Sequence, residues 1–599
     1  FISGLKLSGS YGRNMGSGRG SQLGTTYLLY DFDRGGENGH IYGEDAEIIG
    51  SNEFENGDRL FYSNSNSLSE QYNFTGTYEQ TFGNHNVSAL ATIERGESES
   101  SRERVRKEEV APGSNGHFNT AFGDIDGYTY GYESGSLSYV GRLNYQFDGK
   151  YLVEFLYRTD ASTKFAPENY WGHFYSLSGG WIVTEESFFE SDVIDFLKIR
   201  YSHGKLGKDD TRAWQWRQRY TFQKGHGAVF GGNNPAADGM RMEASPNRNA
   251  TWSDDYQNNI GIDTRFLDDR LSVSVDAFYN KGRNLLLERT GVVPFSIGGT
   301  VAAENFGEVN FWGGEISIGW QDVIGNDFSY GIDLQSAWSN NKVLVGDFGN
   351  NSVLPWIAGP GQSTEIGTWG YDYLGMFRTQ SDIDEYVNRY NIQQVFGVTA
   401  DNLKPGMLYY RDVRGEHLGD GEFAEPDGII DENDQVRLEG PNSSYGFSLT
   451  LKLDYKNLSF NTNLAASFGG YSEIDARDVI METDISQNFE SVPKIWNDIY
   501  DPELNPDGTM PNPYYDQIYN RQSSFWRVSS FRFRMRNFTL SYSLPDATAE
   551  KLRLSSFKVN LTGLNPINFY NPYSYKNVNG SWDSYPVMRT FSLGITLRP

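Results

Sequence analysis

The sequence predicts an all-β protein, a transmembrane antiparallel β-barrel with long extracellular loops. Three observations predict this class. Apolar and polar residues alternate with a period of two along many segments, as strands with one apolar and one wet face require. Aromatic residues make up 15% of the 599 residues and hydrophobic residues only 38%, which suits such strands better than packed soluble domains. Tight turns alternate with long polar segments, the pattern of periplasmic turns and external loops.

Composition excludes several other classes of protein. No run of about eighteen apolar residues occurs, so the sequence predicts no transmembrane helix. The chain has no cysteine, which excludes disulfides and thiolate-bound metals. A net charge of −27 argues against nucleic-acid binding, because phosphate contacts need a basic surface. The chain begins at Phe1 without an initiator methionine or a signal peptide, and we expect processing or incomplete coverage of the true start.

The alternation predicts which side chains meet lipid. Two hairpins, turning at Asp148-Gly149 and at Lys456-Asn457, show it most clearly. The face expected to meet lipid carries Leu137, Tyr139, Tyr151, Val153, Leu449, Leu451 and Phe460. The alternate residues, expected to face the interior, include Arg142, Asn144, Glu154, Arg158 and Thr450.

The connections set the number of strands. Further tight turns are predicted at Gly83-Asn84, Asp268-Asp269 and Gly325-Asn326. Long polar segments are predicted as loops at 14–68, 97–134, 206–254, 341–444 and 469–526. A single membrane strand at 214–224 would place the long segment 225–254 on the side of the membrane that carries the short turns. Residues 214–224 are therefore assigned to a loop. About sixteen membrane strands remain, an even number, and the last runs from Met588 to Arg598. The run Gly16-Ser17-Gly18-Arg19-Gly20 is interpreted as a loop, not as a phosphate-binding cradle.

Several segments resemble one family. A hairpin leads into an R-x-D-x-S-x-x-F-A loop from Arg158, and a W-G-x-F-x-S-x-S-x-G-W strand follows from Trp171. This block is similar to the most recognisable part of SusC/RagA-like TonB-dependent transporters. Collinear matches follow in LKIRYSHGKLG (197–207), FLDDRLSVSVDAFYNKGRNLLL (266–287), NFGEVNFWGGEISIGW (305–320), SFRFRMRNFTLSYSLP (530–545), SFKVNLTGLNPINF (556–569) and SYPVMRTFSLGITLRP (584–599).

The resemblance implies more than this sequence contains. Members of the family have about twenty-two strands, a plug domain inside the barrel and a TonB box before the plug. Residues 1–599 are therefore expected to be the C-terminal part of the barrel, with the plug and roughly six strands outside this sequence. The implied partners are a SusD-like surface lipoprotein, the TonB–ExbB–ExbD system acting through the plug, outer-membrane lipid, and a glycan or peptide substrate.

An acidic stretch resembles a calcium-binding loop of the family, D-x-N-x-D-G-x-I-x-x-x-D. The candidate ligands are Asp412, Asp427, Asp431 and Asp434. Calcium takes six to eight oxygen ligands, often from carboxylates on a flexible loop. Arg414 replaces the usual Asn, and an insertion with Asp420 and Glu422 separates the two halves of the pattern. The alternatives are a solvated acidic loop or one that pairs with basic residues of a partner.

Other chemistry finds no support in the sequence. The seven histidines are scattered without metal-ligand spacing, and no G-x-S-x-G elbow occurs, so we expect no enzyme and no catalytic residues. Loop aromatics have two interpretations, packing within the loops or stacking on sugars or a partner: Trp214, Trp216, Trp356, Trp369, Tyr371 and Tyr373.

The sequence therefore favours an outer-membrane protein that actively imports oligosaccharides or peptides. A passive porin is the first alternative, because about sixteen strands can form a complete porin barrel. A surface scaffold or adhesin anchored by the barrel is another, and a secreted β-rich carbohydrate enzyme is a more distant one.

Overall fold

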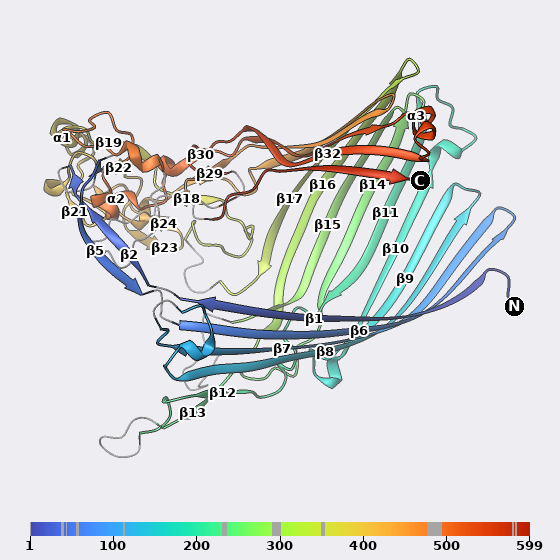
Figure 1. Ribbon diagram of the computed structural model, residues 1–599, viewed down its shortest axis with the longest axis horizontal. Helices are drawn as coiled ribbons and strands as arrows, with labels where there is room; N and C mark the ends of the chain where they lie inside the picture. The colour runs from blue at the N-terminus through green and yellow to red at the C-terminus, as the bar shows by residue number, and fades with distance from the viewer. Residues whose placement is uncertain are drawn as a thin grey trace.

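A computed structural model describes residues 2–599 apart from residues 25, 37–40, 44, 56–58, 112–113, 230–236, 290–300, 349–353, 476–493, 578–579 and 581–583. Antiparallel strands dominate the fold (Figure 1). Within these ranges, no helix is long and apolar enough to cross a membrane.

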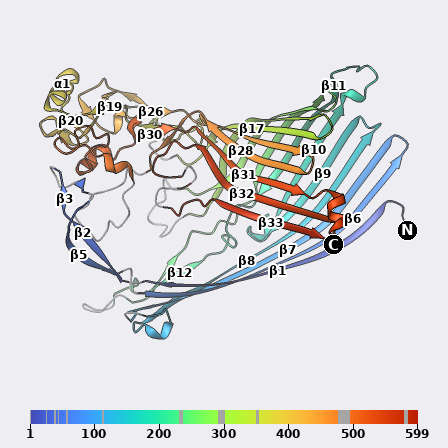
Figure 2. The same cartoon turned by 45° about the horizontal axis from the view of Figure 1, so that its top comes forward.

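Sixteen strands form one continuous antiparallel sheet, as the sequence predicts. In spatial order they are β1 (Leu5–Leu23), β6 (Arg59–Phe82), β7 (His85–Glu108), β8 (Ile125–Phe147), β9 (Tyr151–Ser162), β10 (Trp171–Ile182), β11 (Ile194–Lys208), β14 (Ser253–Phe266), β15 (Leu271–Leu287), β16 (Glu304–Ile324), β17 (Phe328–Val345), β27 (Tyr445–Tyr455), β28 (Leu458–Phe468), β31 (Arg532–Ser543), β32 (Ser556–Tyr570) and β33 (Thr590–Arg598). The sheet curves around a central space (Figures 1 and 2).

The sheet does not close on itself. Across the described ranges, β1 pairs only with β6 and β33 pairs only with β32. The expected open edges along the first and last strands are confirmed. An unpaired strand edge is not tolerated in hydrocarbon, so each of these edges needs a partner strand when the protein is in a membrane.

The five predicted tight turns are confirmed. Gly83, Asp148, Asp268, Gly325 and Lys456 all have positive φ, between 51° and 65°. This left-handed backbone is what two-residue hairpin turns require, and Gly, Asn and Asp adopt it at least cost. All five turns lie at one end of the sheet, so the long connections lie at the other.

The strands at the N-terminal edge extend further than the sequence predicts. Residues 14–23 and 59–68 were expected in a loop, yet they pair throughout as β1 and β6. Residues 97–108 and 125–134 likewise belong to β7 and β8. Most of these extensions carry polar residues on both faces, which weakens the period-two signal although the backbone still pairs. Only β8 keeps the signal among these extensions, at Tyr128, Tyr130 and Tyr132.

The glycine-rich run in β1 was also wrongly assigned to a loop. Gly16, Gly18 and Gly20 face serine residues of β6, and an added Cβ would lie 2.6, 2.8 and 2.9 Å from the serine hydroxyls. Glycine at alternate positions therefore allows the two strands to pair closely.

Other assignments of the sequence are confirmed. Residues 214–224 lie in a loop, where β12 (Tyr220–Gln223) pairs with β13 (Gly239–Met242) in a small sheet separate from the large one. The last strand begins at Thr590, two residues after the predicted Met588.

The described parts of the two longest connections, residues 346–348, 354–444, 469–475 and 494–531, fold together into what we call the extracellular lobe. Its core includes Phe377, Tyr410, Ile430, Ile518 and Trp526, all fully buried. Figure 1 shows the lobe beyond one end of the sheet, opposite to the end where both termini lie.

Short elements build the lobe and the neighbouring loops. The small sheets are β18 (Thr368–Gly370) with β26 (Val436–Glu439), β19 (Tyr373–Met376) with β22 (Leu408–Tyr410), β20 (Gln394–Val395) with β21 (Val398–Thr399) and β25 (Ile429–Ile430), β23 (His417–Gly419) with β24 (Glu422–Phe423), β29 (Tyr471–Glu473) with β30 (Arg527–Ser529), β2 (Thr26–Phe32) with β5 (Ile48–Glu55), and β3 (Arg34–Gly35) with β4 (Ile41–Tyr42). The helices are α1 (Gln380–Tyr390), α2 (Asp516–Tyr519) and α3 (Asp546–Lys551).

Helix α1 begins at a capping box. The hydroxyl of Thr379 accepts a hydrogen bond from the Asp382 N–H, and the Asp382 carboxylate accepts one from the Thr379 N–H at 2.9 Å. The helix ends at Asn391, whose φ is 53°. Its buried residues Ile383 and Tyr386 attach it to the lobe core.

Candidate functional site

One face of the large sheet carries a network of charged side chains. Arg200 on β11 donates to the Asp263 carboxylate on β14 at 2.9 Å and to the Asp276 carboxylate on β15 at 2.6 Å. Ser274 also donates to Asp263, at 2.7 Å. The guanidinium crosses Gly261, where an added Cβ would lie 2.4 Å from its central carbon. Glycine at this position therefore allows one arginine to join three strands.

A second network lies on the same face around Arg158, one of the residues predicted to face the interior. Its guanidinium donates to Asp160 at 2.7 Å and to the Ser138 hydroxyl at 3.1 Å, and it lies 3.2 Å from the Glu94 carboxylate. Placing so many charged groups in the hydrocarbon of the membrane would cost a large amount of free energy. This face is therefore the barrel interior.

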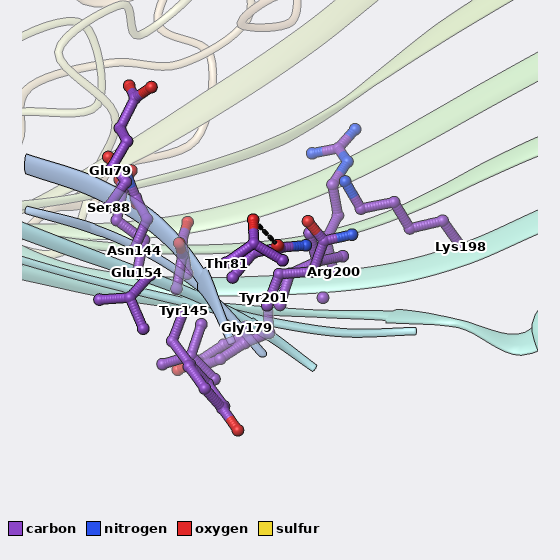
Figure 3. A pocket seen from close by; sticks show the side chains of 18 of the residues that line it. Glu79, Thr81, Ser88, Asn144, Tyr145, Glu154, Gly179, Lys198, Arg200 and Tyr201 are labelled. Atoms are coloured by element: carbon purple, nitrogen blue, oxygen red, sulfur yellow. Dashed lines mark hydrogen bonds between the residues drawn. The ribbon is translucent and has the colours of Figure 1, made fainter. Parts of the chain in front are cut away.

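The opposite face is apolar and exposed, as predicted. Tyr139, Tyr151 and Val153 are 43%, 44% and 45% exposed, which is the behaviour of side chains that meet lipid. Figure 3 shows the two faces together, with the charged ends of Glu79 and Arg200 on one side of the strands and the ring of Tyr145 on the other.

The interior face is hollowed near the turn end of the sheet. A pocket of 640 Å³ lies there, and Asn144 and Glu154, both predicted to face the interior, contribute to its lining (Figure 3). Its other polar groups include Lys198 and Arg200. This hollow is open, and charged and amide side chains lie among its lining residues, so water or a polar domain can occupy it.

In the acidic loop, two of the predicted calcium ligands are close to each other. Asp434 is fully buried, and its carboxylate accepts hydrogen bonds from the N–H groups of Val413 and Asp431 at 2.7 and 2.8 Å. The carboxylate of Asp412 accepts from the Gly428 N–H at 2.6 Å, while its other oxygen is buried without a partner in the described structure. Burial raises the pKa of Asp434 to about 6, and burial also raises the pKa of Asp412.

The other two predicted ligands have local structural roles. Asp431 accepts a hydrogen bond from the Asn433 N–H at 2.8 Å and caps a short 3₁₀ helix. Asp427 accepts from the Ile429 N–H at 2.9 Å. Within the described ranges, no group of three or more His, Asp or Glu side chains is arranged to hold a metal ion. The unpartnered oxygen of Asp412 beside Asp434 fits a cation. The four predicted ligands are, however, not assembled around one point in the described structure, so calcium binding stays a prediction.

The acidic loop departs from the family's calcium-binding pattern in two places, at Arg414 and at the insertion that contains Asp420 and Glu422, and the structure shows what each forms. The insertion forms the β23–β24 hairpin, with Asp420 at its turn. Arg414 donates to the Gln435 carbonyl at 2.7 Å and lies over the rings of Trp356 and Phe423. The guanidinium is thus held by aromatic contacts and a backbone carbonyl.

The loop aromatics pack within the loops. Tyr371 lies in the core of the lobe, and Tyr373 packs edge-on against Phe525 at 5.0 Å between ring centroids. Trp356 contacts Trp369. In another loop Trp214 contacts Trp216, and Arg217 lies over both rings. These contacts favour the packing interpretation over a sugar-stacking platform.

Sequence reasoning missed the Arg200 network. The segment 197–207 was recognised only by its family resemblance, and its strand alternation places Arg200 on the interior face. A period-two pattern predicts on which face of the sheet a charged side chain lies. It cannot predict that Arg200 meets Asp263 and Asp276, because these contacts depend on the register of three strands. An arginine on the wet face was the only signal available.

Comparisons with known proteins agree with this architecture. No family model matches the sequence. The TonB-dependent receptor P3 of Formosa agariphila is 23% identical over 579 residues, which cover 90% of this chain and 53% of the relative. The TonB-dependent receptor SusC of Bacteroides thetaiotaomicron is 27% identical over 351 residues, 57% of this chain and 32% of that protein. The sequence is therefore similar to those of SusC-like TonB-dependent receptors over most of its length.

Solved structures support the same fold for this SusC-like chain. The RagAB peptide importer in its closed-closed state matches with a TM-score of 0.70 at 16% identity, over 100% of this chain and 60% of that chain. A second structure, of the RagAB peptide transporter, matches with a TM-score of 0.68 at 17% identity. The SusC-like chain thus spans 53% of the P3 receptor and 60% of the RagAB chain. It is an outer-membrane β-barrel protein.

Proposed function

We propose that this chain forms most of the barrel of an active importer that brings oligomeric nutrients across the outer membrane. The observation that carries the proposal is the open sixteen-stranded sheet. A porin built from these strands alone would pair β1 with β33, and the two strands do not pair. Further strands and a plug domain, outside this sequence, complete the barrel and couple it to TonB–ExbB–ExbD in this proposal.

The extracellular lobe supports a partner at the cell surface. Its core is well packed, yet Leu418, Leu504 and Tyr514 are 64%, 63% and 63% exposed. Exposed apolar side chains on folded loops commonly mark a protein interface. We propose a SusD-like lipoprotein as the partner, with more than about 1,000 Å² buried in total, as stable interfaces require.

Deletion of the encoding gene tests the import role. The deletion strain should lose growth on one class of oligomer, either oligosaccharide or peptide, and should keep growth on the corresponding monomers. A plasmid copy of the full-length gene should restore growth. If growth on all oligomers survives the deletion, the protein does not import nutrients, and the scaffold or adhesin alternative is favoured.

Purification from native membranes in mild detergent tests the partner. The proposal expects a lipoprotein to co-purify in a fixed ratio with the barrel. Recovery of the bare barrel as a monomer or a homotrimer would instead favour a porin.

A further inference from the structure

Three arginines lie close together at the start of β31. Arg532, Arg534 and Arg536 all line a hollow of 880 Å³ on the interior face of the sheet. The strand begins directly after the loop 469–531, so the three residues lie at the loop end of the barrel interior. A solute that enters from outside meets them before it meets the turn end.

A β-bulge brings the third arginine to this face. Asn463 of β28 pairs with Asn537, and the next residue, Leu464, pairs with Met535, so Arg536 has no partner in the ladder. Two residues of the bulged strand then oppose one residue of β28, and such a bulge changes the direction in which the extra side chain, Arg536, points. Asn463 itself faces the interior, because it donates to the interior Thr450 at 3.2 Å.

Two of the three arginines have no charge partner in the part of the chain that the structure describes. Arg532 donates to the Ser467 hydroxyl at 2.7 Å and is held in place. Arg534 and Arg536 make no hydrogen bond or ion pair with any residue that the structure describes. Arg200 in the same interior, by contrast, has two carboxylate partners.

The hollow offers little negative charge of its own. Its lining contains two carboxylates, and one of them, Asp276, is already bound by Arg200 at 2.6 Å. Glu315 is the other. Much of the remaining lining is small and polar, with serines on several strands that leave space and supply hydroxyl donors.

We propose that Arg534 and Arg536 bind anionic groups of the imported oligomer, carboxylates or sulfates. This inference rests on the proposed import function and narrows its substrate class. Arginine presents paired N–H donors that match such oxyanions in two-point contact. Arg534 is half-buried, which strengthens its contact with an anion, and Arg536 is exposed to the solvent through which a solute arrives. The location at the loop end places the site where a substrate first enters the barrel.

The test uses the purified full-length transporter and calorimetric titration with four probes. The probes are hexagalacturonate, a sulfated glucan hexamer, hexaglutamate and neutral maltohexaose. At least one anionic probe should bind about ten-fold more tightly than the neutral sugar, and the Arg534→Gln, Arg536→Gln double variant should lose about ten-fold in affinity for it. The sugar and peptide arms then distinguish which kind of oligomer carries the anionic groups.

A matched variant removes two charges elsewhere on the same face. Arg142→Gln with Lys452→Gln should leave the affinity for the anionic probes within about two-fold, since neither residue lines the hollow. Equal affinity for neutral and anionic probes, or no loss in the double arginine variant, overturns the proposal. If that variant instead exposes the plug to protease and weakens all probes equally, the arginines seat the plug and the proposal is wrong. Binding of an anionic probe without energised uptake would contradict the import function and leave this site standing.

Discussion

Glu439 and Arg527 form a buried ion pair that joins the two longest loops of the protein. Glu439 lies on β26 in the first loop, Arg527 lies on β30 in the second, and their side chains are 12% and 7% exposed. Glu439 also accepts a hydrogen bond from the Tyr471 N–H at 3.0 Å. The pair therefore joins the two loops that make up the extracellular lobe.

Substitution of Glu439 by Gln should loosen the junction. The change leaves Arg527 buried without a charge partner, which typically costs about 3–5 kcal/mol. Hydrogen exchange should show faster exchange in β26 and β30, with the large sheet unchanged. Glu385→Gln is the control, because its ion pair with Arg389 is 75% and 67% exposed and contributes less than about 1 kcal/mol. Equal exchange in both variants would contradict the structural role of the junction.

The lipid-facing side of the sheet makes a direct prediction. Leu451→Arg should cost about 2–4 kcal/mol of folding free energy in lipid bilayers, because its charge must enter hydrocarbon. Thr450→Arg places the same charge on the interior face and should cost much less. Denaturant titration of the full-length protein in liposomes measures both. A greater loss for Thr450→Arg would reverse the assigned faces.

Gly261 should be intolerant of larger residues. Gly261→Val places atoms where the Arg200 guanidinium lies and should break its bonds to Asp263 and Asp276, at a cost of about 1–3 kcal/mol. Gly141→Val is the matched control, since nothing lies within 4 Å of its added Cβ. Thermal unfolding in detergent should show a lower Tm for the first variant only, and equal Tm values would show that Arg200 is not held as described.

Calcium binding at the acidic loop should depend on pH. Burial raises the pKa of Asp434 from 3.8 to about 6, so without a cation this carboxyl stabilises the fold below about pH 4, and that contribution is lost as the pH rises through 6. Calcium needs the deprotonated carboxylate. It should therefore raise the Tm at about pH 7.5 and much less at about pH 5.

Two variants make the calcium prediction specific. Asp412→Asn should remove the effect of calcium on the Tm, because the unpartnered oxygen of Asp412 lies beside Asp434. Asp420→Asn, on the turn of the inserted hairpin, should leave it unchanged. If calcium has no effect on the wild-type protein at either pH, the loop is a solvated acidic segment.

The sequence predicts the barrel well because a membrane imposes a strict pattern on each strand. Alternation identifies the faces of Tyr139 and Arg158, and glycine, aspartate and lysine at the turns mark the hairpins. The pattern fails where strands leave the bilayer, as in the polar segments 14–23 and 59–68. There most side chains on both faces are polar, so alternation no longer marks the strands although their backbones still pair.

The functional features were harder to predict because they depend on distant residues. The Glu439–Arg527 pair joins residues of two different loops, and the exposure of Arg536 depends on a register shift opposite Asn463. Neither relationship leaves a local signal in the sequence. The acidic loop shows the opposite case, in which a recognisable motif at Asp427 and Asp431 forms local turns and does not assemble the full ligand set.

Energised uptake tests the central proposal most directly. Cells that express the full-length transporter and its lipoprotein partner are given a labelled oligomer on which growth depends on this gene, and accumulation is measured before and after a protonophore collapses the proton gradient. Active import predicts that accumulation stops when the gradient is lost, and that loss of TonB has the same effect. Accumulation that continues unchanged under both conditions would contradict the proposal and would show that the barrel is a passive channel.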